Sequence, residues 1–197
     1  MGKIFFIMGK SASGKDSVYR ALAADSSLGL ALVVPYTTRP RRAGETEGVE
    51  YHFATAGELE ALRAAGKVIE CRVYQTVHGP WAYFTPDDGQ IAPDRGSCLM
   101  IGTLESYNAL RAYFGGDAIV PLYLTVDDGD RLLRAVMRER EQEHPSYTEV
   151  CRRYLADEED FSAEKLAAAG VDHTFDNDDL ETCIDRIREF IRSVSMQ

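Results

Sequence analysis

The stretch MGKSASGKDS, residues 8–17, decides the fold. It contains a GxxxxGK pattern in which Gly9 and Gly14 are followed by Lys15. An apolar run at residues 4–8 precedes the pattern, and helical spacing of apolar side chains follows it at Val18, Ala21 and Leu22. In this strand–loop–helix context, glycines let backbone N–H groups turn around phosphate oxygens at the positive end of a helix. The stretch therefore predicts a phosphate-binding loop, or P-loop.

The candidate nucleotide site is this loop. Lys15 is the first catalytic candidate, because a lysine at this place in the motif reaches the β and γ phosphates of a nucleotide. The alternative is a glycine-rich turn that binds nothing. The residues expected to bind ATP, the phosphate donor, are Gly9, Lys10, Ser11, Ala12, Ser13, Gly14, Lys15, Asp16 and Ser17.

Asp16 occupies the position where the motif usually carries the Ser or Thr that ligates magnesium. A carboxylate repels ATP phosphates unless a metal ion lies between them, so Asp16 and the adjacent Ser17 are candidate ligands of Mg²⁺. A carboxylate in the first turn of a helix is also stabilised by the helix dipole without any metal. Both interpretations stay open.

Strand-like and helix-like segments alternate along the 197 residues, which predicts one α/β domain with a mostly parallel central sheet flanked by helices. The expected strands are residues 3–8, 30–34, 98–101 and 119–126. Pro121 lies inside the last strand, where it removes a hydrogen-bond donor. Residues 36–96 change to an arginine- and glycine-rich loop, a short helix and extended pieces, which indicates an inserted lobe.

Helix boundaries follow from capping signals. Thr55 and Glu58 have capping-box spacing before a helix that Gly66 can close. Ser146 and Glu149 have the same spacing, before a helix expected to run to about residue 169. The remaining expectations are a cap by Asp127 or Asp128 for a helix over 130–143, and a cap by Asp178 with Glu181 for a last helix whose apolar face carries Leu180, Ile184, Ile187 and Ile191.

The net charge of −10 makes the surface repel polyanions, which argues against nucleic-acid and acidic-membrane partners. The apolar run at 4–8 is too short for a signal peptide or a membrane span. Widely spaced cysteines without a CxxC pair indicate free thiols and a cytoplasmic protein; they are Cys71, Cys98, Cys151 and Cys183. Composition leaves the oligomeric state open, and small-molecule nucleotides are the expected partners.

The segment TTRPRRAGETEGVEYHF, residues 37–53, resembles guanylate kinases, which carry a TTR, a second arginine, a GE pair and a tyrosine at this spacing. The resemblance continues through Glu70, an AYFTP segment, an arginine-rich segment at 134–153 and DNDDL at 176–180. It implies a P-loop kinase fold with an inserted nucleotide-binding lobe and a helical lid. The implied division is a core of 1–34, 97–134 and 161–197, an acceptor-binding lobe at 35–96 and a lid at 135–160.

The resemblance implies that Arg39, Arg42 and Tyr51, with Tyr83, hold the acceptor phosphate. Guanidinium groups suit this role because they pair with phosphate through two hydrogen bonds, although an arginine cluster can also be a solvated loop face. Glu70 matches the carboxylate that accepts hydrogen bonds from the N1 and N2 edge of guanine. The complete acceptor set is Arg39, Arg42, Tyr51, Glu70, Tyr83, Thr85 and Thr103.

The lid implied by the resemblance supplies further cations. Arg134, Arg138 and Arg153 are the catalytic candidates, because lid arginines neutralise charge on the transferred phosphoryl group. Arg134 and Arg138 share a helix face, since they are four residues apart. The other interpretation is an outer helix face covered by salt bridges. Asn177, in DNDDL, matches an ATP-contacting residue.

Two positions depart from the family pattern. Pro35 replaces a serine and Thr103 replaces a carboxylate, and both family residues help to read guanine. The segment from His78 to Ala82 adds about four residues. The TTRPRRAGE cluster and Glu70 favour ATP-dependent phosphorylation of GMP or dGMP, which is the leading expectation, whereas Pro35 and Thr103 favour a different acceptor. The alternatives are a ribose 1,5-bisphosphate phosphokinase, whose loop also ends in GKDS, and a non-catalytic guanylate-kinase-like module that binds proteins.

Overall fold

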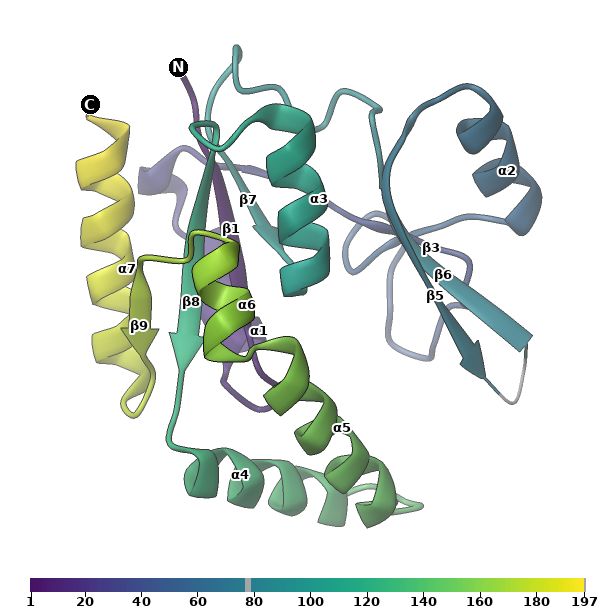
Figure 1. Cartoon of the computed structure of the whole chain (residues 1–197), viewed down its shortest axis with the longest axis vertical. Helices are drawn as coiled ribbons and strands as arrows, with labels where there is room; N and C mark the ends of the chain where they lie inside the picture. The colour runs from purple at the N-terminus through teal and green to yellow at the C-terminus, as the bar shows by residue number, and fades with distance from the viewer. Residues whose placement is uncertain (77–78, 197) are drawn as a thin grey trace.

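The computed structural model describes residues 1–76 and 79–196, and its centre is a parallel five-stranded sheet (Figure 1). The strand order is β2-β7-β1-β8-β9, so β1, the strand before the P-loop, lies in the middle. All pairs within this sheet are parallel. The strands are β1 (Ile4–Gly9), β2 (Ala31–Leu32), β7 (Cys98–Ile101), β8 (Ile119–Thr125) and β9 (Thr174–Asp176). The predicted α/β fold is confirmed.

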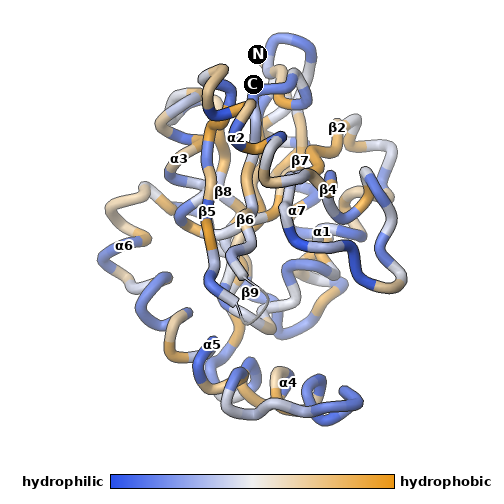
Figure 2. The backbone as a smooth tube through the Cα atoms, turned by 90° about the vertical axis from the view of Figure 1, so that its right-hand side faces the viewer, coloured by the Kyte–Doolittle hydropathy of each residue, from blue (hydrophilic) through white to orange (hydrophobic). Residues whose placement is uncertain are grey.

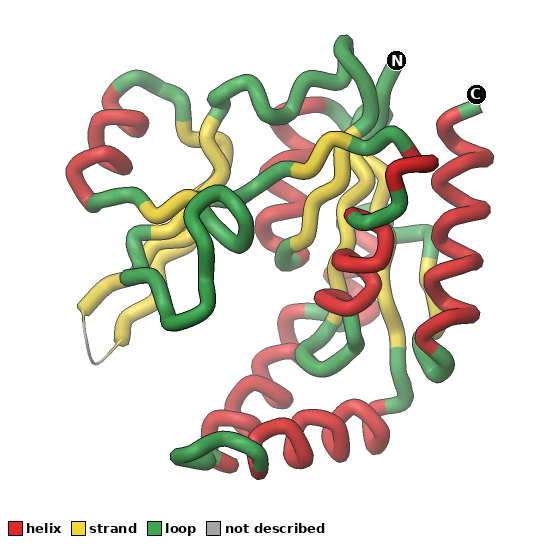
Figure 3. Tube along the Cα trace, turned by 180° about the vertical axis from the view of Figure 1, so that it is seen from behind, coloured by secondary structure: helices red, strands yellow, loops and turns green. Residues whose placement is uncertain are grey.

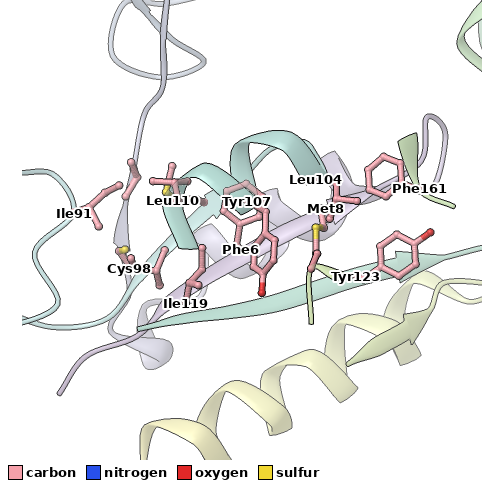
Figure 4. Close-up of a cluster of buried hydrophobic side chains, with 14 residues drawn as sticks. Phe6, Met8, Ile91, Cys98, Leu104, Tyr107, Leu110, Ile119, Tyr123 and Phe161 are labelled. Atoms are coloured by element: carbon pink, nitrogen blue, oxygen red, sulfur yellow. The ribbon is translucent and has the colours of Figure 1, made fainter. Parts of the chain in front are cut away.

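The core lies on both faces of the sheet because side chains alternate along β1. Ile4, Phe6 and Met8 point to one face, where they pack with residues of α3 (Leu104–Phe114) (Figure 4). Phe5 and Ile7 point to the other, where α1 (Lys15–Ala23) and α7 (Leu180–Ser195) cover them. All five side chains are fully buried. The central strand is therefore fixed from both sides, and the loop at its carboxyl end starts from a rigid position.

The proline in β8 does not interrupt the sheet. Tyr123 donates its backbone N–H to His173 on the β9 side, at 3.3 Å, and Pro121 faces the same side because it lies two residues earlier. β9 pairs with β8 only from Tyr123 onward. The missing N–H of Pro121 thus falls before the first pair with β9, where it removes no ladder bond. The second predicted strand, 30–34, is shorter than expected and consists of Ala31–Leu32.

A second sheet forms a lobe beside the core, within residues 36–86, as Figure 3 shows from behind. Its order is β4-β3-β6-β5, with β5 and β6 antiparallel. The capping box at Thr55 and Glu58 is present at the start of its helix. Residues 77 and 78, which include the first residue of the predicted insertion, lie outside the described residues. The elements are β3 (Tyr36–Thr37), β4 (His52–Phe53), α2 (Ala56–Ala64), β5 (Val68–Thr76) and β6 (Gly79–Pro86).

Two helices, α4 (Asp128–Arg140) and α5 (Tyr147–Asp160), project from the sheet beyond β8 (Figure 1). Figure 2 shows that the hydrophobic stretches run along the strands, whereas these two helices are largely hydrophilic. Asp127 caps α4 by accepting from the N–H groups of Gly129 and Asp130, as predicted. The predicted boundary at 134/135 between core and lid falls inside α4, so it does not coincide with a break in the chain's secondary structure.

The predicted capping box at Ser146 was wrong. The Ser146 side chain makes no capping bond, and Glu149 instead pairs with Arg152 and Arg153. The expected long helix is also divided, because α5 ends at Asp160 and α6 (Ala163–Ala168) starts after a new cap at Ser162. Phe161, between the two helices, is buried in the core. Burying this side chain accounts for the turn.

The last helix begins one residue later than the sequence suggested. Asp179, not Asp178, caps α7 by accepting from the N–H of Thr182. Of its predicted apolar face, Ile184, Ile187 and Ile191 are buried in the core, whereas Leu180 is exposed. No helix in the described part of the chain is long and apolar enough to cross a membrane.

Candidate active site

The P-loop joins β1 to α1 in a conformation that requires its glycines. Gly14 has a φ of 84°, and a side chain there would collide with the amide of Asn177. That amide donates to the carbonyl oxygen of Ser13 at 2.7 Å, so the DNDDL segment holds the loop in place through its backbone. At Gly9 an added Cβ would lie 2.8 Å from the carbonyl oxygen of Leu124. Both positions exclude any larger residue without a shift of the loop or its neighbours.

Acidic side chains of α5 contact this loop directly. The backbone N–H of Ser11 donates to Oδ2 of Asp157 at 2.7 Å. Lys10 pairs with Glu158, with Nζ 2.7 Å from Oε1. Arg131, which is only 2% exposed, forms ion pairs with Asp157, Glu158 and the first residue of α4, Asp128. Together these groups fasten α5 to the P-loop.

Lys15 and Asp16 face a cavity of about 800 Å³ that separates the core from the lobe. Its far wall comes from β5 and β6, and a third wall comes from α5. Nine of the predicted site residues line this one cavity: Lys15, Asp16, Arg42, Tyr51, Glu70, Tyr83, Thr85, Thr103 and Arg153. A second cavity of about 610 Å³ shares Lys15 and Thr103 with the first and extends past Ser11 along α3 and α6.

Arg39 lies beneath the cavity rather than on its wall. It is 3% exposed, and its guanidinium binds Glu45 through two hydrogen bonds, of 2.7 and 3.0 Å. The guanidinium carbon also lies 5.4 Å from the ring centre of Tyr51, whose ring does line the cavity. The hydrogen bonds from Arg39 lower the pKa of Glu45 to about 2. In this conformation Arg39 supports the lobe and positions Tyr51. Of the two arginines Arg39 and Arg42, only Arg42 lines the cavity.

The Arg39–Glu45 pair makes the stability of the protein depend on pH. The folded-state pKa of Glu45 is depressed, so the pair stabilises the fold above the ordinary pKa of about 4.5 and loses that contribution as the pH falls toward about 2. We expect Glu45→Gln to unfold at lower urea concentration than the wild type at pH 7, and the difference to shrink between pH 4.5 and pH 2.5. A difference that stays constant over this range would contradict the assigned pairing. Glu60→Gln, on the surface of α2, is the matched control.

Glu70 is held in a network of side chains on the lobe wall. Thr85 donates to its Oε1 at 2.9 Å, and Nε of Arg72 donates to its Oε2 at 3.0 Å. Arg72 also donates to Oγ1 of Thr103 at 3.2 Å, which links the lobe to the core across the cavity. Arg72, which was not predicted, therefore joins Glu70 to Thr103, two of the positions that the sequence marked for base recognition.

The candidate lid arginines occupy different places. Arg153 reaches the cavity wall, where Nε donates to Oε1 of Glu149 at 2.8 Å. Arg134 donates to the carbonyl oxygen of Asn177, with both terminal nitrogens at 3.3 Å. Arg138 lines a separate cavity of about 120 Å³ together with Ser11 and Arg153. The structure thus brings Arg153 to the main cavity and leaves Arg134 and Arg138 outside it.

Comparison with known proteins finds guanylate kinases in both sequence and structure. The sequence profile of the guanylate kinase family matches residues 1–79. The chain is 29% identical over 191 residues to a guanylate kinase of Mycoplasmoides gallisepticum, which covers 96% of this chain and 92% of that protein. It is 38% identical over 120 residues to a guanylate kinase of Granulibacter bethesdensis. The crystal structure of guanylate kinase from Anaplasma phagocytophilum superposes with a TM-score of 0.63 at 23% identity, over 100% of this chain and 87% of that one.

The chain is similar to guanylate kinases in sequence and in fold. The matched stretch spans 54% of the Granulibacter bethesdensis guanylate kinase, and the family profile ends at residue 79, so the similarity is strongest over the P-loop and the lobe. This part of the chain carries Lys15, Arg39, Arg42, Tyr51 and Glu70.

The structure adds Arg72 and Arg152, which were not predicted, to the wall of the cavity. The position of Arg72 has a simple sequence signal, since it lies two residues after Glu70 on an extended segment and therefore shares its face. Asp157 and Arg131 had no such signal, because only the packing of α5 and α4 brings them to the P-loop.

Proposed function

We propose that the protein transfers the γ-phosphoryl group of ATP to a nucleoside monophosphate, with GMP or dGMP as the acceptor. The observation that carries the proposal is the shared cavity, which has Lys15 of the P-loop on one wall and Arg42, Tyr51 and Glu70 of the lobe on the opposite wall. A donor phosphate at the loop and an acceptor in the lobe would meet inside this one cavity. The guanylate kinase relatives support the same reaction.

The chemistry needs positioning and charge neutralisation rather than a general base. The phosphate of a nucleoside monophosphate has a second pKa of roughly 6, so an acceptor oxygen is already ionised near neutral pH. What remains is to align the two phosphates and to stabilise the charge on the group in transfer. Lys15 supplies charge from the donor side, and Arg42 and Arg153 supply it from the acceptor and α5 sides of the cavity.

The residues present fit ATP and Mg²⁺. Oγ of Ser13 and Oδ1 of Asn177 are buried beside the loop without a hydrogen-bond partner among the residues that the structure describes. No cluster of three or more His, Cys, Asp or Glu side chains in that part of the chain can hold a metal. Mg²⁺ would therefore rest on ATP phosphates and on Asp16 or Ser17, as is usual for this ion. The ion would neutralise charge on the bridging phosphate oxygens.

Residues 135–160 are proposed as the lid that closes over the donor. This segment contains the end of α4 and all of α5, and its Glu158 and Asp157 form ion pairs with Lys10 and Arg131. Contacts of this kind can be exchanged for contacts to phosphate. Closure would carry Arg153, and with it Arg138, toward the transferred group and exclude water.

A coupled ADP-release assay tests the proposal. The acceptors are GMP, dGMP, AMP, UMP, CMP and ribose 1,5-bisphosphate, each with ATP and Mg²⁺, and reactions without acceptor or with excess chelator are the controls. We expect GMP and dGMP to give the highest kcat/KM and chelator to stop the reaction. A preference for ribose 1,5-bisphosphate would assign the protein to the alternative kinase reaction. Absence of ADP with every acceptor, together with tight binding of a phosphopeptide, would leave a protein-binding module.

A further inference from the structure

Glu70 and Arg72 form a composite surface on the wall of the main cavity. Both side chains project from β5 to the same face because they lie two residues apart. Their side chains are 4% and 14% exposed, and Nε of Arg72 lies 3.0 Å from Oε2 of Glu70. Both line the cavity. A ligand in the acceptor lobe therefore meets a carboxylate and a guanidinium held side by side.

A hydrogen-bond count shows what this surface can still offer. An arginine has five N–H donors, and the bonds to Glu70 and Thr103 use three of those on Arg72. Two donors remain without a partner in the described ranges 1–76 and 79–196. Each carboxylate oxygen of Glu70 has one short protein donor, at 2.9 and 3.0 Å, and so keeps acceptor capacity. The surface presents free acceptors next to free donors.

The net charge of the pair decides which chemical group it favours. Glu70 and Arg72 cancel, so a phosphate placed against Arg72 would lie beside a carboxylate and gain little. A neutral group with hydrogen donors next to an acceptor matches better. Guanine has this arrangement, because its N1–H and N2–H₂ donors lie next to the O6 acceptor, whereas adenine carries an amino group at position 6.

We propose that Arg72 is a specificity-determining residue that donates to O6 of the guanine base while Glu70 accepts from N1–H and N2–H₂. The assignment rests on the proposed function. It supplies a charged donor directly beside Glu70, whereas Pro35, which also lines the cavity, has no side-chain donor. The contact from Arg72 to Thr103 holds the guanidinium at this point. Arg72 thereby selects a 6-oxo purine against a 6-amino purine.

The test compares Arg72→Met with the wild type on three acceptors: GMP, 6-thio-GMP and IMP. The thio analogue keeps both donors but replaces O6 with a poor acceptor, whereas IMP keeps O6 and lacks the 2-amino group. We expect the wild type to lose about tenfold to 100-fold in kcat/KM on the sulfur substitution, as for a bond to a charged donor. In Arg72→Met the ratio of GMP to 6-thio-GMP should fall to about 1, while the ratio of GMP to IMP is retained. Arg63→Met, on the exposed side of α2, controls for loss of charge.

Three results would overturn the assignment. If Arg72→Met lowers activity on all three acceptors by the same factor, Arg72 only supports Glu70. If the wild type accepts GMP and 6-thio-GMP equally, O6 is not read at all. If the wild type phosphorylates none of the three purines, the proposed function fails together with this inference. The last outcome is separate from the first two, in which GMP is still phosphorylated.

Discussion

Lys15→Ala is expected to lower the rate of phosphoryl transfer at least about 10³-fold, the order of magnitude found when a charge that stabilises a transition state is removed. Lys15 begins α1 at the end of the P-loop and lines both large cavities, of about 800 and 610 Å³. It is the only lysine on the wall of the first, within the described residues. The measurement is kcat in the ADP-release assay at saturating GMP and ATP.

The control for this variant is Lys67→Ala, which removes an exposed lysine of the lobe that lines neither cavity. It should keep wild-type turnover. Circular dichroism should show that both variants are folded, since neither side chain is part of the core. Turnover at the wild-type rate in Lys15→Ala would remove the P-loop lysine from the mechanism and with it the proposed donor site.

Arg131→Ala is expected to have the largest effect on stability, a loss of about 3 kcal/mol in the free energy of unfolding. Arg131 is 2% exposed, faces three carboxylates, and its guanidinium carbon lies 4.2 Å from the ring centre of Tyr154. Without Arg131, the carboxylates of Asp128, Asp157 and Glu158 repel one another with Lys10 left to neutralise them. The loss stays below that of a fully buried pair because Asp128 and Glu158 are 52% and 39% exposed. Urea unfolding at pH 7 measures the effect.

The matched control is Arg63→Ala, which breaks an ion pair with Glu60 on the exposed side of α2, in which both side chains are about half exposed or more. An exposed pair of this kind contributes at most about 1 kcal/mol. If the two variants unfold at the same urea concentration, the cluster around Arg131 is not what holds α5 to the core.

The parts of the fold that could be predicted are those fixed by short-range pattern. β1, the P-loop and α1 follow each other directly, and each carries its own signal in apolar runs, glycine spacing and helical periodicity. The caps at Thr55 and Asp127 were also predictable, because a cap depends only on the next three residues. The central sheet followed from the alternation of strands and helices.

The errors arose where other side chains, or burial in the core, override a local signal. Ser146 and Glu149 have the spacing of a capping box, but Glu149 is taken by Arg152 and Arg153, while the N–H of Ser146 donates to Glu139. Burial of Phe161 broke a helix that the sequence presented as continuous.

The site shows the same limit. The TTR motif identified the arginines of the lobe but not which of them face the cavity. That choice depends on Glu45, whose carboxylate holds Arg39 in the interior and leaves Arg42 on the wall. Arg72, by contrast, could have been found, since alternation along β5 places it beside Glu70.

The hydrogen bond between the Ser11 amide and Asp157 gives the protein an internal competitor for its own ligand. A carboxylate of α5 already occupies a loop amide that an incoming phosphate would use. In the proposed donor site, a nucleotide that took this amide would exchange one anion for another, and the displaced acid would carry α5 with it. The affinity for a nucleotide would then depend on the difference between the binding free energies of the nucleotide and of Asp157 at this loop. It should respond to substitutions that only change how firmly α5 is docked, even at Tyr154, which lines neither large cavity.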